Sequence, residues 1–359
     1  MSLFPWAEPG GPLEPPGFLN YWAHWDGAWY SEVATEGYDY RAPESTAFFP
    51  IFPLLVRAGM ALGGGPAFWG ILISLVATVF AVYFLYRIAE KLWDVEAARA
   101  AALTFAFFPT AFFLNAMYTE ALFVAFTAGS FWAVYVRRDL LLAGVLGALA
   151  AATRNFGVLL LIPLGYEWLH NRQEFGRWGA WKMALVPAGL LGYVTFLWTW
   201  FGDPAIFFSQ QGAHWSRYLT DPATALGMAW TTAGEGLGYL LDPAMLFLDQ
   251  TSDPTIEASN TTNLAFLALF LVLMGVGFVI LPPGLSVYTF LVTLLPILTP
   301  SPLIPLMGLP RYMLGAFSLF LLLGYLLSRS KLALYSWLVV SGGLGVALTA
   351  LFVTWRWVA

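Results

Sequence analysis

The chain has 359 residues, of which 59% are hydrophobic, 18% aromatic and only 10% charged, and its mean hydropathy is +0.71. Soluble domains carry about 25% charged residues, so this composition excludes a soluble globular protein. The net charge of −5, with 16 scattered basic residues, excludes a nucleic-acid partner. Because backbone amides must be paired inside hydrocarbon, and the long apolar runs lack the alternation of barrels, we expect an all-α polytopic integral membrane protein.

Apolar runs predict about ten membrane helices. Crossing a bilayer takes roughly 17–25 residues, and seven runs reach that length. They are residues 67–92, 97–114, 119–136, 181–201, 264–281, 310–327 and 333–353. Shorter runs at 140–152, 156–169 and 285–299 are marginal for a crossing, and we expect the short helices around Arg154 to meet inside the protein.

We interpret residues 1–359 as one membrane-embedded domain in four parts. They are a first extracytoplasmic loop with interfacial helices (1–66), a helical core (67–201), a long extracytoplasmic loop (202–263) and C-terminal helices (264–359). Since residues 1–46 contain no spanning run and no basic residue before Arg41, we expect a further helix to precede this loop in the complete protein.

The distribution of charge predicts the orientation, because short cytoplasmic loops retain Lys and Arg. One side collects ten of the 16 basic residues: Arg87, Lys91, Arg99, Arg137, Arg138, Arg172, Arg177, Lys182, Arg329 and Lys331. The other side holds 15 of the 21 acidic residues and both long loops. We therefore expect the acidic side to be extracytoplasmic and to carry the function.

The segment His24-Trp25-Asp26-Gly27-Ala28-Trp29-Tyr30 mixes an acid with aromatic rings. In a partly dry interface a carboxylate can act as a general base, and aromatic rings can pack against sugar faces. The alternative is a belt of interfacial Trp and Tyr anchors with a solvated acid. Composition leaves both interpretations open.

Three further charged residues stand beside apolar runs, where ionisable groups are costly and generally face a site. Glu120 opens a helix after Thr119, and its alternative role is to favour the helix dipole. Arg154 and Arg311 lie at predicted extracytoplasmic helix ends, where a guanidinium can hold a lipid phosphate. Their alternative role is a structural ion pair with Asp26, Glu120 or an acid of the late loop.

The long loop contains Gln210-Gln211-Gly212-Ala213-His214-Trp215-Ser216-Arg217, whose polar side chains beside a Trp suit sugar hydroxyls. The three histidines lack metal-ligand spacing, and a divalent cation held by Asp26 and Glu120 stays open as the only metal or cofactor. No P-loop, G-x-G-x-x-G or G-x-S-x-G element occurs, so the sequence supports neither ATP-driven transport, dinucleotide chemistry nor serine hydrolysis.

Several short motifs, in order along the chain, resemble those of the glycosylphosphatidylinositol second-mannosyltransferase (PIG-V) family, and its bacterial relatives most. They are Trp25-Asp26 with Trp29-Tyr30 and Gly37-Tyr38, Phe48-Phe49-Pro50 with Pro53, Tyr118-Thr119-Glu120-Ala121-Leu122-Phe123, Thr153-Arg154 with Gly157, Gln211 with Trp215 and Arg217, and Arg311-Tyr312. The family normally carries a helix ahead of the Trp-Asp loop, from which this chain departs.

The resemblance implies the GT-C glycosyltransferase fold, with inverting transfer of a sugar, usually mannose, from a polyprenyl-phosphate donor to a hydroxyl at the extracytoplasmic face. It implies Asp26 as the general base, Glu120 as a second acid for acceptor or metal, and Arg154 or Arg311 as the phosphate-binding group. The expected partners are membrane lipids, this donor, and a glycolipid, polysaccharide or protein hydroxyl as acceptor. Substrate contacts are expected from Trp25, Trp29, Tyr30, Tyr118, Gln211, Trp215, Arg217 and Tyr312.

Two other classes of protein remain open. A lipid-linked sugar or oligosaccharide transporter (flippase) would place its charges inside discontinuous helices at the membrane midplane, with inverted repeats. We find no internal repeat, and the candidate residues cluster toward one face. A structural subunit of a larger complex would need no acids at the interface.

Overall fold

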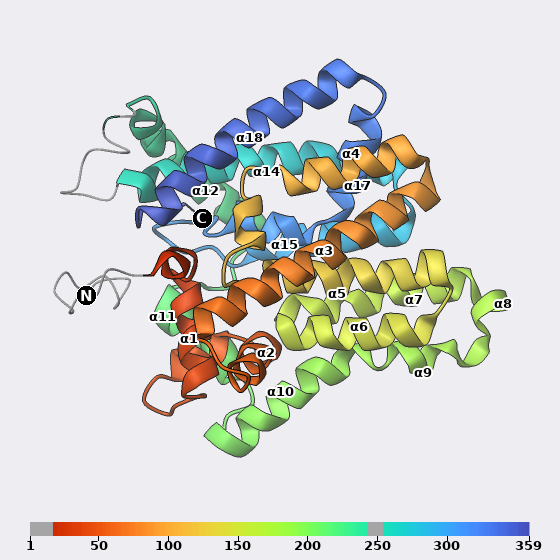
Figure 1. The fold of residues 1–359 in the computed structure, drawn as a ribbon, viewed down its shortest axis with the longest axis horizontal. Helices are drawn as coiled ribbons and strands as arrows, with labels where there is room; N and C mark the ends of the chain where they lie inside the picture. The colour runs from red at the N-terminus through yellow and green to blue at the C-terminus, as the bar shows by residue number, and fades with distance from the viewer. Residues whose placement is uncertain (1–16, 243, 245–253, 359) are drawn as a thin grey trace.

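The computed structural model describes residues 17–242, 244 and 254–358 of the chain (Figure 1). All regular structure in these residues is helical, which confirms the predicted all-α class. Parts of two predicted loops, residues 1–16 and residues 243 and 245–253, lie outside the described residues.

Within the described residues, four helical segments are long and apolar enough to cross a membrane. They are α3 (Pro66–Leu92), the segment Arg177–Phe201 that contains η6 (Arg177–Gly179), α9 (Ala180–Met183) and α10 (Val186–Phe201), α14 (Pro254–Ile280) and α18 (Lys331–Val353). A fifth crossing is possible where Leu309–Gly315, made of α16 (Leu309–Tyr312) and η7 (Met313–Gly315), meets α17 (Ser318–Leu327) at an angle of 84°. The predicted ten membrane helices are therefore not shown, and four to five spans are.

One predicted span is interrupted in the structure, and another continues from an α-helix into a π-helix. The run 97–114 forms α4 (Val95–Ala106) and the 3₁₀ helix η3 (Ala111–Leu114), with Pro109 between them. Proline lacks a backbone N–H and disfavours helical geometry in the residue before it, so α4 stops at a length of about 18 Å. The run 119–136 forms α5 (Glu120–Trp132) and a five-residue π-helix, η4 (Ala133–Arg137). A hydropathy plot does not detect such breaks.

The remaining helices are short or lie at the ends of the molecule. They are η1 (Phe18–Trp22), α1 (Asp26–Thr35), η2 (Pro43–Ala47), α2 (Ile51–Met60), α6 (Leu140–Thr153), η5 (Asn155–Leu160), α7 (Leu161–His170), α8 (Arg172–Phe175), α11 (Ile206–Trp215), α12 (Pro222–Leu240) and α15 (Pro283–Leu298). In Figure 1, α1, α2 and α11 lie at the end that holds the C-terminus, and α8 lies at the opposite end. The predicted loop 202–263 contains α11, α12 and the first residues of α14.

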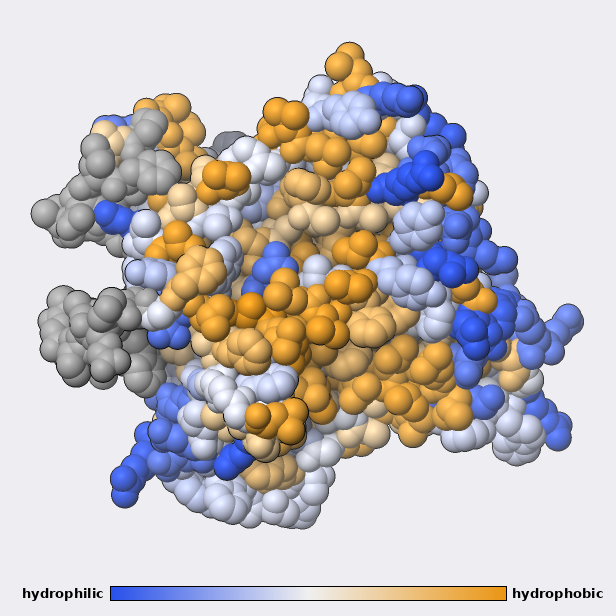
Figure 2. All heavy atoms as spheres, in the orientation of Figure 1, coloured by the Kyte–Doolittle hydropathy of each residue, from blue (hydrophilic) through white to orange (hydrophobic). Residues whose placement is uncertain are grey.

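Hydrophobic surface fills the centre of the face shown in Figure 2, and hydrophilic surface gathers toward its two ends. A bilayer demands this arrangement, because its hydrocarbon core excludes charge and its interfaces accept it. The surface and the candidate spans together show an integral membrane protein.

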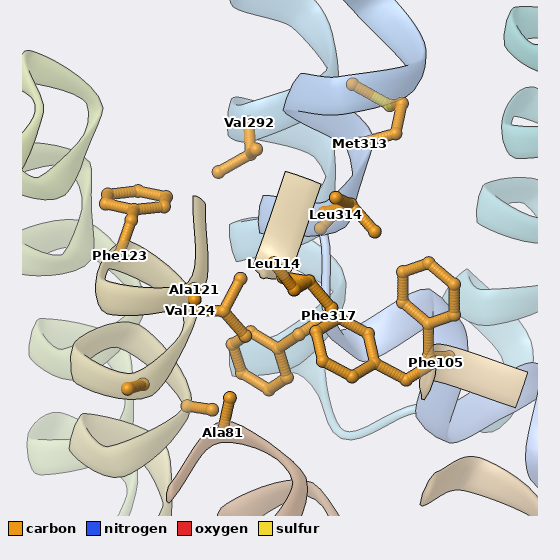
Figure 3. Close-up of a cluster of buried hydrophobic side chains, with 14 of the residues drawn as sticks. Ala81, Phe105, Leu114, Ala121, Phe123, Val124, Val292, Met313, Leu314 and Phe317 are labelled. Carbon is orange, nitrogen blue, oxygen red and sulfur yellow. The ribbon is translucent and has the colours of Figure 1, made fainter. Parts of the chain in front are cut away.

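A buried apolar cluster joins the start of α5 to the bend after α16 (Figure 3). Phe123 and Val124 of α5 lie near Leu314 and Phe317 of the bent segment. A Cβ added to Gly315 would lie 3.2 Å from the Phe123 ring, so the ring packs directly against the backbone of Gly315. Thr110 Oγ1 also donates to the carbonyl of Pro310 at 2.9 Å. These contacts hold Glu120, at the first position of α5, close to Arg311 in α16.

Candidate functional site

Asp26 is the first residue of α1, and the turn before it is clamped to the loop that precedes α5. The Tyr118 hydroxyl donates to the carbonyl of His24 at 2.8 Å, and the amide of Met117 donates to the carbonyl of Trp22 at 2.9 Å. Trp25 has φ 54° and ψ −117°, a backbone conformation that residues other than glycine rarely adopt. Strained residues of this kind persist where the surroundings over-determine them, commonly at functional sites.

A chain of ion pairs joins the four charged residues predicted for the site. Arg311 Nη1 lies 2.6 Å from Asp26 Oδ2, and Arg311 Nε lies 3.0 Å from Glu120 Oε1. The same Glu120 oxygen accepts a hydrogen bond from Arg154 Nη2 at 2.5 Å. Arg154 and Arg311 therefore both form the ion pairs that the sequence analysis left open as an alternative to phosphate binding.

Arg154 lies in extended backbone between α6 and η5, with φ −152° and ψ 144°. Its Nε donates to Thr119 Oγ1 at 2.8 Å, and the Tyr30 hydroxyl lies 3.1 Å from the same oxygen. Burial opposes the charge of Arg154, but the neighbouring Glu120 and Tyr30 more than offset it, so the pKa of Arg154 lies above its ordinary value. Arg154 therefore stays cationic.

A cavity of 230 Å³ opens beside this chain of ion pairs. Eleven of the twelve predicted site residues line it: Trp25, Asp26, Trp29, Tyr30, Tyr118, Arg154, Gln211, Trp215, Arg217, Arg311 and Tyr312. Glu120 is the exception, because its side chain is only 1% exposed and lies behind the two arginines. Residues from motifs spread over almost 290 residues thus converge on one cavity.

The cavity has a cationic part around the ring of Tyr312. The guanidinium carbons of Arg154, Arg217 and Arg311 lie 5.2, 5.5 and 5.0 Å from the ring centroid. Ser216, with φ 54°, ends α11, and Arg217 then donates from Nη2 to the carbonyl of Met307 at 2.7 Å. Three guanidinium groups around one aromatic ring create a strong attraction for an anion.

A second part of the cavity wall is aromatic. The rings of Trp29 and Phe48 are stacked with centroids 5.6 Å apart, and Trp215 lies edge-on to Phe48 at 5.8 Å. His214 lies edge-on to Trp29 at 5.8 Å. Flat apolar rings beside polar groups such as Gln211 can hold the face and the hydroxyls of a sugar at once.

Charge in the site favours a singly charged anion. Asp26, Arg154, Arg217 and Arg311 line the cavity, and with Glu120 behind them the formal charges sum to +1. A phosphodiester, with one negative charge, would bring the site to neutrality. Partial burial of these groups makes such compensation more valuable than in water.

A metal ion fits these residues poorly. The part of the chain that the structure describes contains no group of three or more His, Cys, Asp or Glu able to hold a metal. Arg311 bridges Asp26 and Glu120, the two acids considered for a cation. A divalent cation between them would meet two guanidinium groups, so we derive no step through a metal.

The sequence missed the C-terminal residues that line the cavity: Phe352, Trp355, Trp357 and Val358. Trp355 stacks on His24 with ring centroids 3.7 Å apart, and Trp357 lies edge-on to Trp25 at 5.3 Å. Burial lowers the pKa of His24 to about 4, and the nearby backbone of Phe352 offsets part of this shift. The imidazole that faces Trp355 is therefore neutral at pH 7. Two tryptophans after the last apolar run were the available signal.

Comparison with known proteins identifies one family and one solved structure. Residues 45–200 match the family described as dolichyl-phosphate-mannose-protein mannosyltransferase. No curated protein matches. The crystal structure of ArnT from Cupriavidus metallidurans bound to undecaprenyl phosphate is similar, with a TM-score of 0.48 and 15% sequence identity. The match covers 85% of this chain and 54% of that one, so the chain spans about half the length of that protein.

The family match includes α5 and α6, and with them Glu120 and Arg154, but neither Asp26 nor Arg311. This match does not show whether the chain belongs to the glycosylphosphatidylinositol second-mannosyltransferase family that the motifs resemble. Over residues 45–200, the chain is therefore similar to the dolichyl-phosphate-mannose-protein mannosyltransferase family.

Proposed function

We propose that the protein is a glycosyltransferase that moves a sugar, mannose in the first instance, from a polyprenyl-phosphate donor to a hydroxyl acceptor. The observation that carries the proposal is the ion pair between Asp26 and Arg311 at 2.6 Å, on the wall of a cavity that Arg154 and Arg217 also line. It combines an acid able to accept a proton with guanidinium groups able to hold a phosphate. The family match over residues 45–200 supports the same activity.

The proposed reaction inverts the configuration of the sugar. The acceptor oxygen forms a bond to the anomeric carbon while its proton passes to the Asp26 carboxylate. The bond from that carbon to the phosphate oxygen breaks, and its electron pair leaves with the polyprenyl phosphate. Charge on the phosphate increases in this step, and the arginines stabilise it. Phosphate is a good leaving group, so the site needs a base more than an acid.

Glu120 takes a different part from the one that the resemblance implies. Its Oε1 contacts both Arg154 and Arg311, and its side chain is sealed from the cavity. We assign it the positioning of the two guanidinium groups rather than contact with acceptor or metal. Preorganised charges of this kind cost no reorganisation during the reaction.

The sugar of the donor is assigned to the aromatic wall formed by Trp29, Phe48 and Trp215. Gln211 also lines the cavity and can bond sugar hydroxyls. The reaction then takes place at the end of the molecule that holds α1, α11 and the C-terminus. From the distribution of Lys and Arg, we assign this end to the extracytoplasmic side.

The finer assignments extend the same proposal. We assign the chain a GT-C fold and a relationship to the glycosylphosphatidylinositol second-mannosyltransferase family, on the motifs at Trp25-Asp26, Tyr118-Glu120 and Arg311-Tyr312. The acceptor is a glycolipid, polysaccharide or protein hydroxyl. Transport is disfavoured, because the charged residues of the four candidate spans all lie near an end of their span.

The test is transfer of radiolabelled mannose from polyprenyl-phosphate mannose to a membrane lipid extract by the purified protein. Wild type should transfer label, and Asp26→Asn should lose about 10²–10⁴-fold in rate, the usual contribution of a general base. Asp39→Asn, an exposed acid outside the cavity, is the matched control and should transfer normally. Equal transfer by wild type and Asp26→Asn, both correctly folded, would refute the assignment of the base.

A further inference from the structure

A second cavity, an open groove of 940 Å³, lies along α1 and the start of α3. Its polar lining comes mainly from α1 and the turn before it: His24, Ser31, Glu32, Thr35 and Glu36. Glu32 and Glu36 are the only charged residues that line it within the described part of the chain. The charged lining of the groove is therefore acidic, and it stands with two hydroxyl groups among apolar residues, whereas the 230 Å³ cavity is cationic.

Only two of the described residues, Ala28 and Trp355, line both cavities. Ala28 lies two residues after Asp26, so the wall that the two cavities share lies close in sequence to the proposed base. Trp355 is 45% exposed and rests on the neutral ring of His24 at 3.7 Å. The indole thus stands where the groove meets the reaction site.

Backbone geometry explains how the chain returns to this position after α18. Trp355 has φ 63°, its amide donates to the carbonyl of Phe352, and the amide of Arg356 donates to the carbonyl of Leu351. These two bonds form a Schellman motif, in which glycine is the favoured residue at positive φ. A tryptophan here costs about 1 kcal/mol of strain. A costly residue at a cavity junction points to a role for its ring.

We propose that the groove binds the acceptor, that this acceptor is an uncharged glycan, and that Trp355 determines its access to Asp26. This inference rests on the proposed function and names the acceptor class. Glutamates and hydroxyl groups bond sugar hydroxyls, and an indole packs against the apolar face of a sugar ring. The same glutamates repel an acceptor with a phosphate beside the reacting hydroxyl. The donor phosphate is left to the arginines of the other cavity.

The absence of cysteine from the chain allows each cavity to be probed by one introduced thiol. Ser31→Cys reports on the groove, and Asn155→Cys reports on the cationic cavity. Octyl α-mannoside, below its micellar concentration in a non-glycosidic detergent, should slow maleimide labelling of Ser31→Cys several-fold. It should leave Asn155→Cys unaffected, and polyprenyl phosphate should show the reverse pattern.

The two cysteine probes test the two proposals separately. Loss of protection of Asn155→Cys by polyprenyl phosphate would count against the proposed function. Protection of Asn155→Cys by the mannoside, or no protection of Ser31→Cys, would overturn the groove as the acceptor site while leaving that function intact. Equal protection of Ser31→Cys by octyl phosphate would overturn the preference for an uncharged acceptor.

The role of Trp355 is tested with Trp355→Gly, which removes the ring and relieves the positive φ. Protection of Ser31→Cys in this background should require about tenfold more octyl α-mannoside. Because the ring also lines the cationic cavity, the polyprenyl phosphate needed to protect Asn155→Cys should be measured in parallel, and it should change less than the mannoside does. Trp355→Phe should restore part of the mannoside affinity. Trp230→Ala, an exposed tryptophan that lines neither cavity, is the control. Unchanged mannoside affinity in Trp355→Gly would refute the role of the ring.

Discussion

Replacing Glu120 by glutamine should destabilise the protein far more than replacing Asp26 by asparagine. Glu120 is 1% exposed and its Oε1 faces both Arg154 and Arg311, whereas Asp26 is 26% exposed and, among the described residues, forms an ion pair with Arg311 only. Removing one partner of a buried ion pair costs about 3–5 kcal/mol, because the remaining charge stays buried. A more exposed pair contributes about 1 kcal/mol.

These energies convert to melting temperatures. In a chain of this size 1 kcal/mol shifts the melting temperature by about 2 °C, so Glu120→Gln should melt about 6–10 °C lower and Asp26→Asn about 2 °C lower. Intrinsic fluorescence of the 17 tryptophans in detergent gives both values. The positioning role of Glu120 is refuted if the two variants melt together, or if Glu120→Gln melts with wild type.

Three further variants test other parts of the site. Arg217→Gln should raise the KM for polyprenyl-phosphate mannose about tenfold, because one charge-assisted contact is lost. Replacing the exposed Arg41 by Gln should leave this KM unchanged, and steady-state transfer rates compare the two variants. Gly157→Ala should lower the free energy of unfolding by about 1–3 kcal/mol and lower transfer, because its Cβ would lie 2.2 Å from the Ala150 backbone. Gly165→Ala, with open space around it, should do neither. Melting temperatures and transfer rates compare the two variants. Because the pKa of His24 is lowered from 6.5 to about 4, the unfolded chain binds a proton before the folded one. The melting temperature should therefore fall as pH falls from 6.5 to 4, and His24→Phe should flatten this slope.

The long helices were predictable because a continuous apolar run is sufficient to specify them. Helix α3 begins within one residue of the predicted span 67–92, and α18 within two of 333–353. The missed breaks arise from packing and from single residues. Pro109 ends the helical run before η3, and the bend of 84° before α17 follows the close approach of Gly315 to Phe123. Hydropathy averages over such positions.

The membership of the cavity was predictable, but the arrangement of its charges was not. Sequence motifs indicated Asp26, Glu120, Arg154 and Arg311 as one site, and left open whether the arginines serve a phosphate or an ion pair. In the structure Arg311 bridges the two acids, and Glu120 lies behind it. That order depends on the contacts between the turn before α1, the loop before α5 and the segment Leu309–Gly315, which are distant in sequence.

Trp355 shows where composition stops being informative. A tryptophan just after a membrane helix is typical of an interfacial belt, and the sequence left the same interpretation open for Trp29, which lines the cavity. The two roles differ only in where the backbone goes next. At Trp355 the Schellman motif turns the chain back onto His24, about 330 residues earlier in the sequence. The motif here lacks the glycine by which it is usually recognised in a sequence. An aromatic belt and an aromatic site are therefore the same pattern in sequence, and the cavity that Trp29 and Trp355 line is the structural feature that separates them.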